Sequence, residues 1–337
     1  MSSVENGDIL PYSSISLSAT QDGADLVVMC YGTRLCIRLS PKNISLDDEV
    51  RRQYEDFVDA LDDQPEVMQE LEDWLIKPCI PHIKHLKSPS HWTKQSSVQE
   101  YFNPPTLIFD LKVVSGHLQA VSAPTNPRTL DALRPKIAVQ DEVVSRAIQQ
   151  GVLTVSAPDL IIQRDEELSD WEYYNFPKLV TQAGQLFYLK VISDSGSFRR
   201  ELDILLRTKS ASNSLYITKL VALVQWPGEA LIAGFLLEHI PKAKTLDWAE
   251  EGSTQKQRAR WMAELRHTVG ELHKLDVVWE DVKPENVMID AEDHAWVIDF
   301  GGGHSAHWVE PSLYGTAEGD LSGLRSIAEH LGVQWMQ

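Results

Sequence analysis

The sequence has few cysteines, no long apolar run and a shortage of positive charge. Its three cysteines, Cys30, Cys36 and Cys79, form no Cys-x-x-Cys pair and are too sparse for a disulfide framework. No apolar stretch approaches the length of a membrane span. The first 14 residues lack the basic and apolar regions of a signal peptide. We therefore expect an intracellular, cytoplasmic protein with reduced thiols.

Acidic residues outnumber basic ones by 49 to 31, which gives a formal net charge of −18. Such a balance disfavours binding to the phosphates of nucleic acids and to anionic membrane surfaces. Neither is expected as a partner. The 337 residues, of which 43% are hydrophobic, suffice for two globular domains or one large one.

Residues 1–151 predict an α+β accessory region with its own core. Residues 1–24 are polar and are expected to be loosely held, and residues 25–40 read as two strands joined at Gly32-Thr33. The pattern turns helical over 45–76, with a break at Pro65 and Ser45 as a capping residue. A second hairpin is expected over 106–123, a loop over 82–104 and a short helix over 141–149. No motif in this region points to a chemistry.

The most informative stretch is residues 277–303, VVWEDVKPENVMIDAEDHAWVIDFGGG. It contains Asp281, Lys283 and Asn286, and then Asp299 in an Asp-Phe-Gly sequence. Apolar, β-prone residues on both sides of the turn at 291–294 predict a loop, a strand, a turn and a second strand that ends at Asp299. This order brings the two carboxylates and the amide to one edge of a small sheet.

Phosphoryl transfer needs a carboxylate to orient the attacking hydroxyl, oxygen ligands for Mg²⁺ and a cation near the transferred group. The stretch resembles the catalytic loop and Asp-Phe-Gly segment of protein kinases, in a divergent form similar to fungal-type kinase-like proteins. The resemblance implies that Asp281 is the catalytic base and that Lys283 stabilises the moving phosphoryl group. It also implies that Asn286 and Asp299 hold Mg²⁺ and that ATP is the phosphate donor.

The resemblance covers residues 152–337 and implies an α+β, bilobal protein-kinase-like fold after the accessory region. The β-rich small lobe is expected over about 152–240 and the mainly helical, shortened large lobe over about 241–337. The expected hairpin 177–192 carries Lys190, which would contact the ATP phosphates, and the expected helix 197–208 carries Glu201 as its partner.

Three further residues take their expected roles from the same resemblance. Glu238 and Ile240 lie in the expected hinge, where backbone groups would bind adenine. Asp320 opens the last expected helix and resembles the aspartate that braces the catalytic loop.

The sequence departs from the family pattern in four places. The segment between the first two small-lobe strands, residues 164–177, has no Gly-x-Gly-x-x-Gly and five acidic residues, which would crowd and repel phosphates. Trp279-Glu280 replaces the His-Arg before the catalytic aspartate. Gly315-Thr316 resembles the substrate-docking segment, but no Ala-Pro-Glu follows it and the sequence ends at Gln337.

Two classes of function remain open. The first is an ATP- and Mg²⁺-dependent phosphotransferase, whose acceptor is a protein Ser/Thr hydroxyl or a hydroxyl of a small metabolite. The short docking segment favours the metabolite, whereas Lys283 two residues after Asp281 favours the protein. The second is a pseudokinase that serves as a binding or scaffold module. The motifs also allow transfer of the nucleotide part of ATP.

Overall fold

The computed structural model describes most of the chain in eleven stretches: residues 12–45, 47–61, 64, 66–84, 86, 96–125, 130–131, 133–163, 178–210, 215–303 and 305–335. The described residues divide into two compact units. The first, called the accessory unit, takes the described residues of 12–134 and 161–163, and the second, called the kinase-like unit, takes those of 135–160 and 178–335. The boundary expected between residues 151 and 152 therefore differs from the division seen here.

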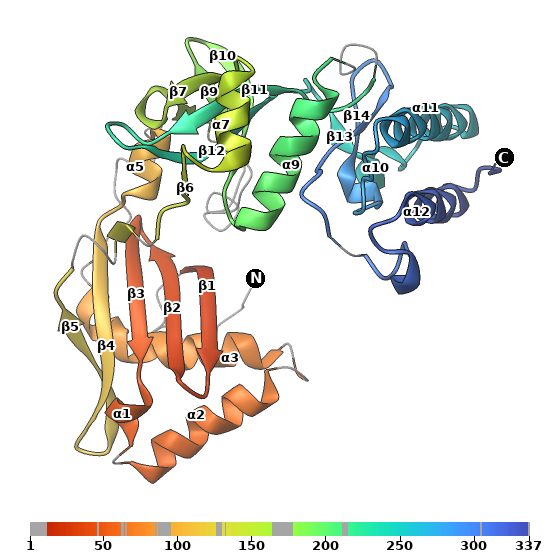
Figure 1. The fold of residues 1–337 in the computed structure, drawn as a ribbon. Coiled ribbons are helices and arrows are strands. Elements are labelled where there is room, and N and C mark those ends of the chain that lie inside the picture. Colours follow the sequence, from red (N-terminus) through yellow and green to blue (C-terminus); the bar gives the residue numbers. More distant parts are fainter. Residues whose placement is uncertain are drawn as a thin grey trace. The chain divides into compact units, whose positions relative to one another are not determined.

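The accessory unit is built on a five-stranded sheet in the order β1-β2-β3-β4-β5 (Figure 1). Neighbouring strands are antiparallel except for the parallel pair β3 and β4, which needs a long crossover. The turn at Ser115-Gly116 joins β4 to β5 as predicted. The strands are β1 (Ser13–Thr20), β2 (Gly23–Cys30), β3 (Thr33–Leu39), β4 (Thr106–Val114) and β5 (His117–Ala123).

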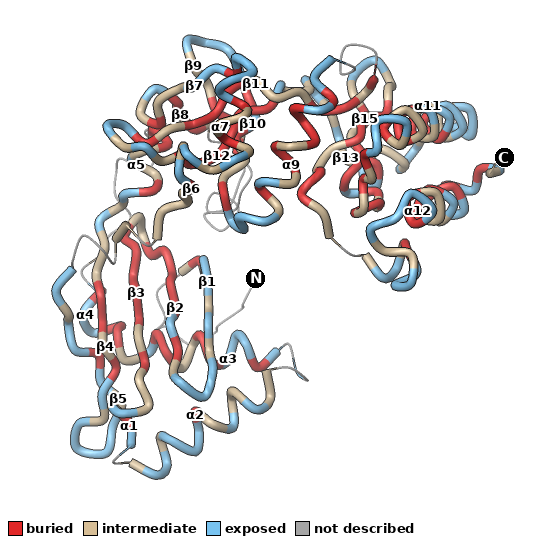
Figure 2. Tube along the Cα trace, in the orientation of Figure 1, coloured by how far each residue is buried: buried red, intermediate tan, exposed pale blue. Residues whose placement is uncertain are grey.

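The crossover between β3 and β4 carries the helices of this unit. Apolar residues of α2 and α3, among them Tyr54, Leu71 and Leu75, are buried against alternate residues of β2 and β3. Figure 2 shows this burial along both central strands. The helices are α1 (Pro41–Ile44), α2 (Asp48–Ala60), α3 (Glu66–Ile76), α4 (Ile80–Ile83) and α5 (Val98–Phe102). A 3-10 turn, η1 (Lys77–Cys79), joins α3 to α4, and β8 (Ile161–Ile162) forms a bridge from Ile161 to Ser97.

Three expectations for this unit were wrong. The first strand, β1, lies within the stretch expected to be loosely held, because a half-exposed, serine-rich edge strand carries little apolar alternation. The helix expected from Ser45 begins at Asp48, and the side chain of Asp47 caps it by accepting hydrogen bonds from the N–H groups of Glu49 and Val50. The helix α5 also lies in the stretch expected to be loop.

The β-rich lobe of the kinase-like unit has strands in the order β7-β11-β12-β10-β9, with β6 paired to β12. The hairpin of β9 and β10 turns at Ala183-Gly184 as predicted, and it sets Lys190 opposite Phe235. Gly234, which precedes Phe235 in β12, lies so close to the carbonyl of Lys190 that a β-carbon on Gly234 would collide with that carbonyl. Glycine therefore allows the close approach of β12 to the strand that carries Lys190.

The elements of this lobe begin before residue 152. Its strands are β6 (Ile137–Ala138), β7 (Leu153–Ser156), β9 (Lys178–Gln182), β10 (Gln185–Val191), β11 (Leu220–Gln225) and β12 (Leu231–Glu238). Its helices are α7 (Glu142–Gln149) and α9 (Ser195–Thr208), and η3 (Ala157–Asp159) is a 3-10 turn. The helix α7, expected in the accessory region, is tied to α9 by ion pairs of Arg199 with Asp141 and of Arg146 with Asp203.

The helical lobe surrounds a small antiparallel sheet in the order β13-β14-β15. The long helix α11 begins with a capping box in which Thr254 and Gln257 satisfy each other's backbone N–H groups. The elements are β13 (Lys244–Thr245), α10 (Leu246–Ala249), α11 (Gln255–Lys274), η4 (Pro284–Asn286), β14 (Val287–Ile289), β15 (Ala295–Val297), η5 (Pro311–Leu313) and α12 (Ala317–His330).

One continuous core joins the two lobes of the kinase-like unit. Its buried residues include Leu202 of α9, Phe235 of β12 and Leu265 of α11. The β-rich and helical lobes confirm the predicted α+β, bilobal kinase-like fold. None of the helices in the described part of the chain combines the length and apolar character needed to cross a membrane.

Candidate functional site

A cavity of about 560 Å³ lies within the kinase-like unit. Its volume falls in the range of small-molecule and cofactor sites. Apolar residues make up much of its wall, among them Leu237, Met288 and Ile298. Six residues that the sequence singled out line it together: Lys190, Glu201, Glu238, Ile240, Asn286 and Asp299. An apolar chamber with a few convergent ionic groups suits a ligand that has a flat apolar part and a charged part.

The ionic end of the cavity is centred on Lys190 of β10. Its Nζ lies 2.5 Å from Oε2 of Glu201 on α9 and 2.7 Å from Oδ1 of Asp299, which follows β15. The sequence thus named three residues that three separate elements bring into contact. Glu201 is 1% exposed, whereas Asp299 is 40% exposed, so Asp299 is the carboxylate that an incoming cation can reach.

The charges of this cluster shape the pKa of each member. Burial on its own would lower the pKa of Lys190, but the Glu201 and Asp299 carboxylates outweigh it and raise that pKa. Burial raises the pKa of Glu201, and Lys190 offsets part of the effect. Burial also opposes ionisation of Asp299, yet the charge of Lys190 and hydrogen bonds from Lys190 and the Gly301 N–H hold its pKa below the ordinary value. Lys190 and Asp299 are therefore both charged at neutral pH.

A second cluster is centred on Asp281. Asp281 is buried and is not among the residues that line the cavity. Oδ2 of Asp281 accepts a hydrogen bond from the side-chain amide of Asn286 at 2.8 Å and lies 2.7 Å from Nζ of Lys283. The same Asn286 amide donates to the Asp281 carbonyl at 2.9 Å. The turn η4 places these groups, and Asn286 belongs to both clusters because it also lines the cavity.

Asp320 fixes the loop that carries Asp281. It is 1% exposed at the start of α12, and its carboxylate accepts hydrogen bonds from the backbone N–H groups of Trp279 at 2.8 Å and Glu280 at 2.9 Å. It also contacts Nε2 of His273 at 2.8 Å. A buried carboxylate with three donors holds the backbone before Asp281 in one conformation. These contacts support the bracing role that the resemblance predicts for Asp320.

Trp279 and Glu280, the departures noted before Asp281, both have defined contacts. The indole N–H of Trp279 donates to the carbonyls of Ile298 at 3.0 Å and Asp299 at 3.2 Å. Trp279 is fully buried, so it ties the loop of Asp281 to the end of β15. Glu280 adopts a positive φ of 75° and forms an ion pair with Arg200 at 3.0 Å.

Arg200 of α9 took no functional role from the sequence. Its guanidinium donates to the carbonyl of Val278 at 2.8 Å and to that of Phe300, in addition to its ion pair with Glu280. It therefore links the helix of Glu201 to the loop of Asp281 and to the segment of Asp299. The sequence shows that Arg200 directly precedes Glu201. It does not show the backbone acceptors of Arg200, because they lie 78 and 100 residues away in the chain.

The apolar end of the cavity includes the expected hinge. Glu238 and Ile240 both line it, and the Glu238 N–H is committed to the Lys219 carbonyl at 2.9 Å. Thr218 was missed by the sequence reasoning. It lines the cavity at 7% exposure, and its hydroxyl has no hydrogen-bond partner among the described residues. A buried hydroxyl on a cavity wall is a natural contact for a polar ligand atom.

The acidic segment 164–177, which takes the place of a glycine-rich loop in the sequence, lies outside the described residues. In the described part of the chain, no group of three or more His, Cys, Asp or Glu side chains is arranged to hold a metal ion. The oxygens of Asn286 and Asp299 are instead a two-residue donor set. Such a set suits Mg²⁺, which proteins often bind through one or two side chains together with substrate phosphates.

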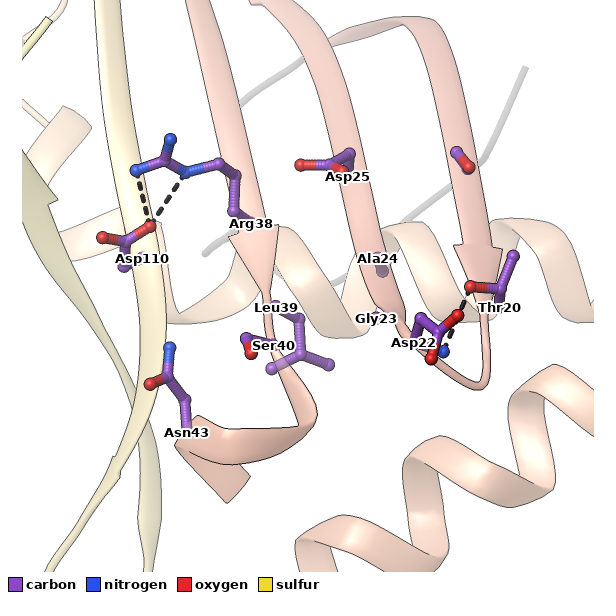
Figure 3. A pocket seen from close by; sticks show the side chains of 11 residues that line it. Thr20, Asp22, Gly23, Ala24, Asp25, Arg38, Leu39, Ser40, Asn43 and Asp110 are labelled. Atoms are coloured by element: carbon purple, nitrogen blue, oxygen red, sulfur yellow. Dashed lines mark hydrogen bonds and ion pairs between the residues drawn. The ribbon is translucent and has the colours of Figure 1, made fainter. Parts of the chain in front are cut away.

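The accessory unit has a hollow of its own, of about 380 Å³, beside the turn between β1 and β2 (Figure 3). Its one arginine, Arg38, forms an ion pair with Asp110 at 2.8 Å, and the Asp22 N–H donates to the Thr20 hydroxyl. These pairings leave the hollow without a cluster of groups arranged for chemistry. The kinase-like unit is therefore the better candidate for a functional site.

Comparisons with known proteins match the kinase-like unit. Residues 179–320 match the protein kinase domain family. The serine/threonine-protein kinase sck1 of Schizosaccharomyces pombe is 39% identical over 72 residues, which are 20% of this chain and 10% of that protein. The serine/threonine-protein kinase SCH9 of Candida albicans is 34% identical over 108 residues, or 30% of this chain and 13% of that protein.

A human relative shows a similar pattern. Ribosomal protein S6 kinase alpha-2 of Homo sapiens is 29% identical over 134 residues, which are 36% of this chain and 17% of that protein. The alignments thus span between 10% and 17% of the length of these three relatives. Fold, site and matched segment together show that the chain contains a protein-kinase-like domain.

Proposed function

We propose that the chain is an ATP- and Mg²⁺-dependent phosphotransferase that moves the γ-phosphate of ATP to a hydroxyl group. The observation that carries the proposal is the double contact of Lys190, with Glu201 on one side and Asp299 on the other, beside an apolar cavity. A cation held between two carboxylates in the wall of such a cavity is suited to bind phosphates. The serine/threonine-protein kinases among the relatives make a protein Ser/Thr hydroxyl the preferred acceptor.

Each residue has a role in this proposal that its contacts support. Lys190 binds the α- and β-phosphates, and Glu201 keeps it in place. Bound Mg²⁺ would neutralise negative charge on the phosphates. Asp299 offers an exposed carboxylate to that ion, and Asn286 offers its amide oxygen, because its amide nitrogen is committed to Asp281.

Asp281 acts on the acceptor. Its Oδ2 is held by Asn286 and Lys283, which orients the carboxylate. Its Oδ1 accepts a hydrogen bond from the Ser305 hydroxyl at 2.9 Å, and an incoming acceptor hydroxyl would take the place of Ser305 there. Lys283 can move from Asp281 to the transferred phosphoryl group as negative charge builds up there. At the apolar end, the backbone of Glu238 and Ile240 and the hydroxyl of Thr218 are expected to contact adenine.

The proposal is tested by transfer of labelled phosphate from [γ-³²P]ATP with Mg²⁺ to casein and, separately, to a panel of small alcohols and sugars. We expect transfer by the wild type and a loss of at least about a hundredfold in Asp281→Asn, which cannot accept the hydroxyl proton. Asp276→Asn is a matched control, since Asp276 lies upstream of the same loop. Binding of ATP without transfer to any acceptor, the chain itself included, would identify a pseudokinase.

A further inference from the structure

The segment 135–160 belongs to the kinase-like unit although it precedes residues 179–320, which match the protein kinase domain family. It contains β6, α7 and β7, in this order. The strand β6 pairs antiparallel with β12, and β7 pairs parallel with β11. Because β12 also pairs with β10, the segment is fixed on both sides of α7 to the sheet that carries Lys190.

Between these two strands, α7 packs against α9, the helix of Glu201 (Figure 1). Val144 and Ala147 of α7 are fully buried, and they belong to the same hydrophobic cluster as Leu202 and Leu205 of α9. Burial of apolar side chains is the main favourable contribution to such packing. The segment therefore connects the sheet of Lys190 to the helix of its carboxylate partner.

Charged residues set the register of α7 on α9. Arg199 and Asp203 are four residues apart and so lie on one face of α9. They pair with Asp141, which caps α7, and with Arg146. These exposed pairs contribute little free energy one by one. A shift of α7 by one turn, however, would place Asp141 beside Asp203 or Arg146 beside Arg199, and like charges repel.

A neighbouring face of α9 is held by the loop before Asp281. Arg200 donates a hydrogen bond to the carbonyl of Val278 at 2.8 Å, and Arg207 donates one to the carbonyl of Asp276 at 3.0 Å. This loop lies within the residues that match the family, whereas α7 lies outside them. The position of α9 thus depends on a contact that the matched residues do not supply.

We propose that α7 is a positioning element for Glu201, because it holds α9 where that carboxylate reaches Nζ of Lys190. The inference rests on the proposed function, in which this ion pair keeps Lys190 in place for the ATP phosphates. It goes beyond that function by giving the segment 135–160 a part in nucleotide use. Arg146 and Ala147 are the residues through which α7 acts.

The test compares full-chain variants in transfer from [γ-³²P]ATP to casein, in calorimetric binding of ATP with Mg²⁺ and in amide hydrogen exchange of α9. Arg146→Glu places a carboxylate beside Asp203, and the added substitution Asp203→Arg restores opposite charges. Ala147→Leu overfills a buried position between the helices and pushes them apart. Gln149→Glu adds a carboxylate to an exposed position of α7 and is the control.

We expect kcat/KM for ATP to fall about fivefold in Arg146→Glu and about tenfold or more in Ala147→Leu, because misplaced reacting groups slow transfer. Exchange in α9 should become faster in both variants, while KM for casein stays the same. The charge-swapped double variant should return to within about twofold of the wild type. Gln149→Glu should match the wild type. Recovery in the double variant separates positioning from a general loss of stability.

Unchanged transfer and ATP binding in both α7 variants would overturn the inference and leave the proposed function intact. A loss in Arg146→Glu that Asp203→Arg does not reverse would do the same. A wild type that binds ATP but transfers no phosphate would overturn the proposed function alone, and the Kd of ATP then decides the role of α7. Absence of ATP binding by the wild type would overturn both.

Discussion

Lys190 is the residue on which the ionic end of the cavity depends. It is one quarter exposed and compensates the charge of Glu201, which is 1% exposed. Lys190→Met would leave that carboxylate buried without its cation. A fully buried broken pair loses ~3–5 kcal/mol. Because Lys190 is partly exposed to water, we expect a smaller loss of ~2 kcal/mol in the free energy of unfolding.

Urea denaturation measures this loss, and a double variant separates stability from function. Lys190→Met with Glu201→Leu removes both charges and should regain most of the stability, yet it should still fail to bind ATP. Recovery of ATP binding in the double variant would show that Lys190 does not contact the phosphates.

The charge states of Lys190 and Asp299 predict a simple pH dependence. The pKa of Asp299 is depressed from 3.8, so its stabilising contribution is present above that pH and is lost as pH falls through the folded-state value. The pKa of Lys190 is raised from 10.5, so its contribution is present below that pH and is lost only as pH rises through its folded-state value.

The stability difference between wild type and Asp299→Asn should therefore stay constant between about pH 5 and about pH 9. It should shift against the wild type below this window, as Asp299 binds a proton, and above it, as Lys190 loses one. Urea denaturation of both proteins across this range measures it. A change centred near neutral pH would mean that Asp299 is not held in its ionised form by Lys190.

At the scale of elements, α9 is coupled to the catalytic loop through Arg200. This side chain joins the helix of Glu201 to Val278, Glu280 and Phe300. We expect Arg200→Ala to lower kcat/KM for transfer by about tenfold or more, because small misplacements of reacting groups slow catalysis strongly. Arg199→Ala is the control and should have little effect. Arg199 lies on the same helix as Arg200, is 44% exposed and pairs with Asp141, which caps α7. Equal losses in both variants would assign the effect to α9 stability.

The elements also show what the sequence could reveal. The hairpin that leads to Asp299 and the strand of Lys190 were predictable, because their apolar alternation and turns are local. The contact of Ser305 with Asp281 was not, since it depends on how two glycines turn the backbone. The place of α7 beside α9 was missed because ion pairs such as Arg199 with Asp141 join residues 58 positions apart. The roles of Asp281, Asn286 and Asp299 stay predictions until they are tested.

At the scale of the whole molecule, the described residues form a large hydrophobic core in each unit. One joins Tyr54 and Leu71 to the sheet of the accessory unit, and the other runs from α7 to α12 of the kinase-like unit. A ligand that binds one folded unit stabilises that unit. We expect Mg²⁺ with ATP to slow amide hydrogen exchange in β10, α9 and β14, and to leave β2 and β3 unchanged. Protection confined to β2 and β3 would place the nucleotide in the accessory unit.

The most direct test of the nucleotide site is calorimetric titration of ATP into the wild type and Asp299→Asn, each with and without Mg²⁺. We predict that the wild type binds ATP more tightly when Mg²⁺ is present, and that the variant loses most of this gain while remaining folded. Binding that is equally tight in all four titrations, or absent from the wild type in the presence of Mg²⁺, would contradict the assignment of Asp299 and of the cavity.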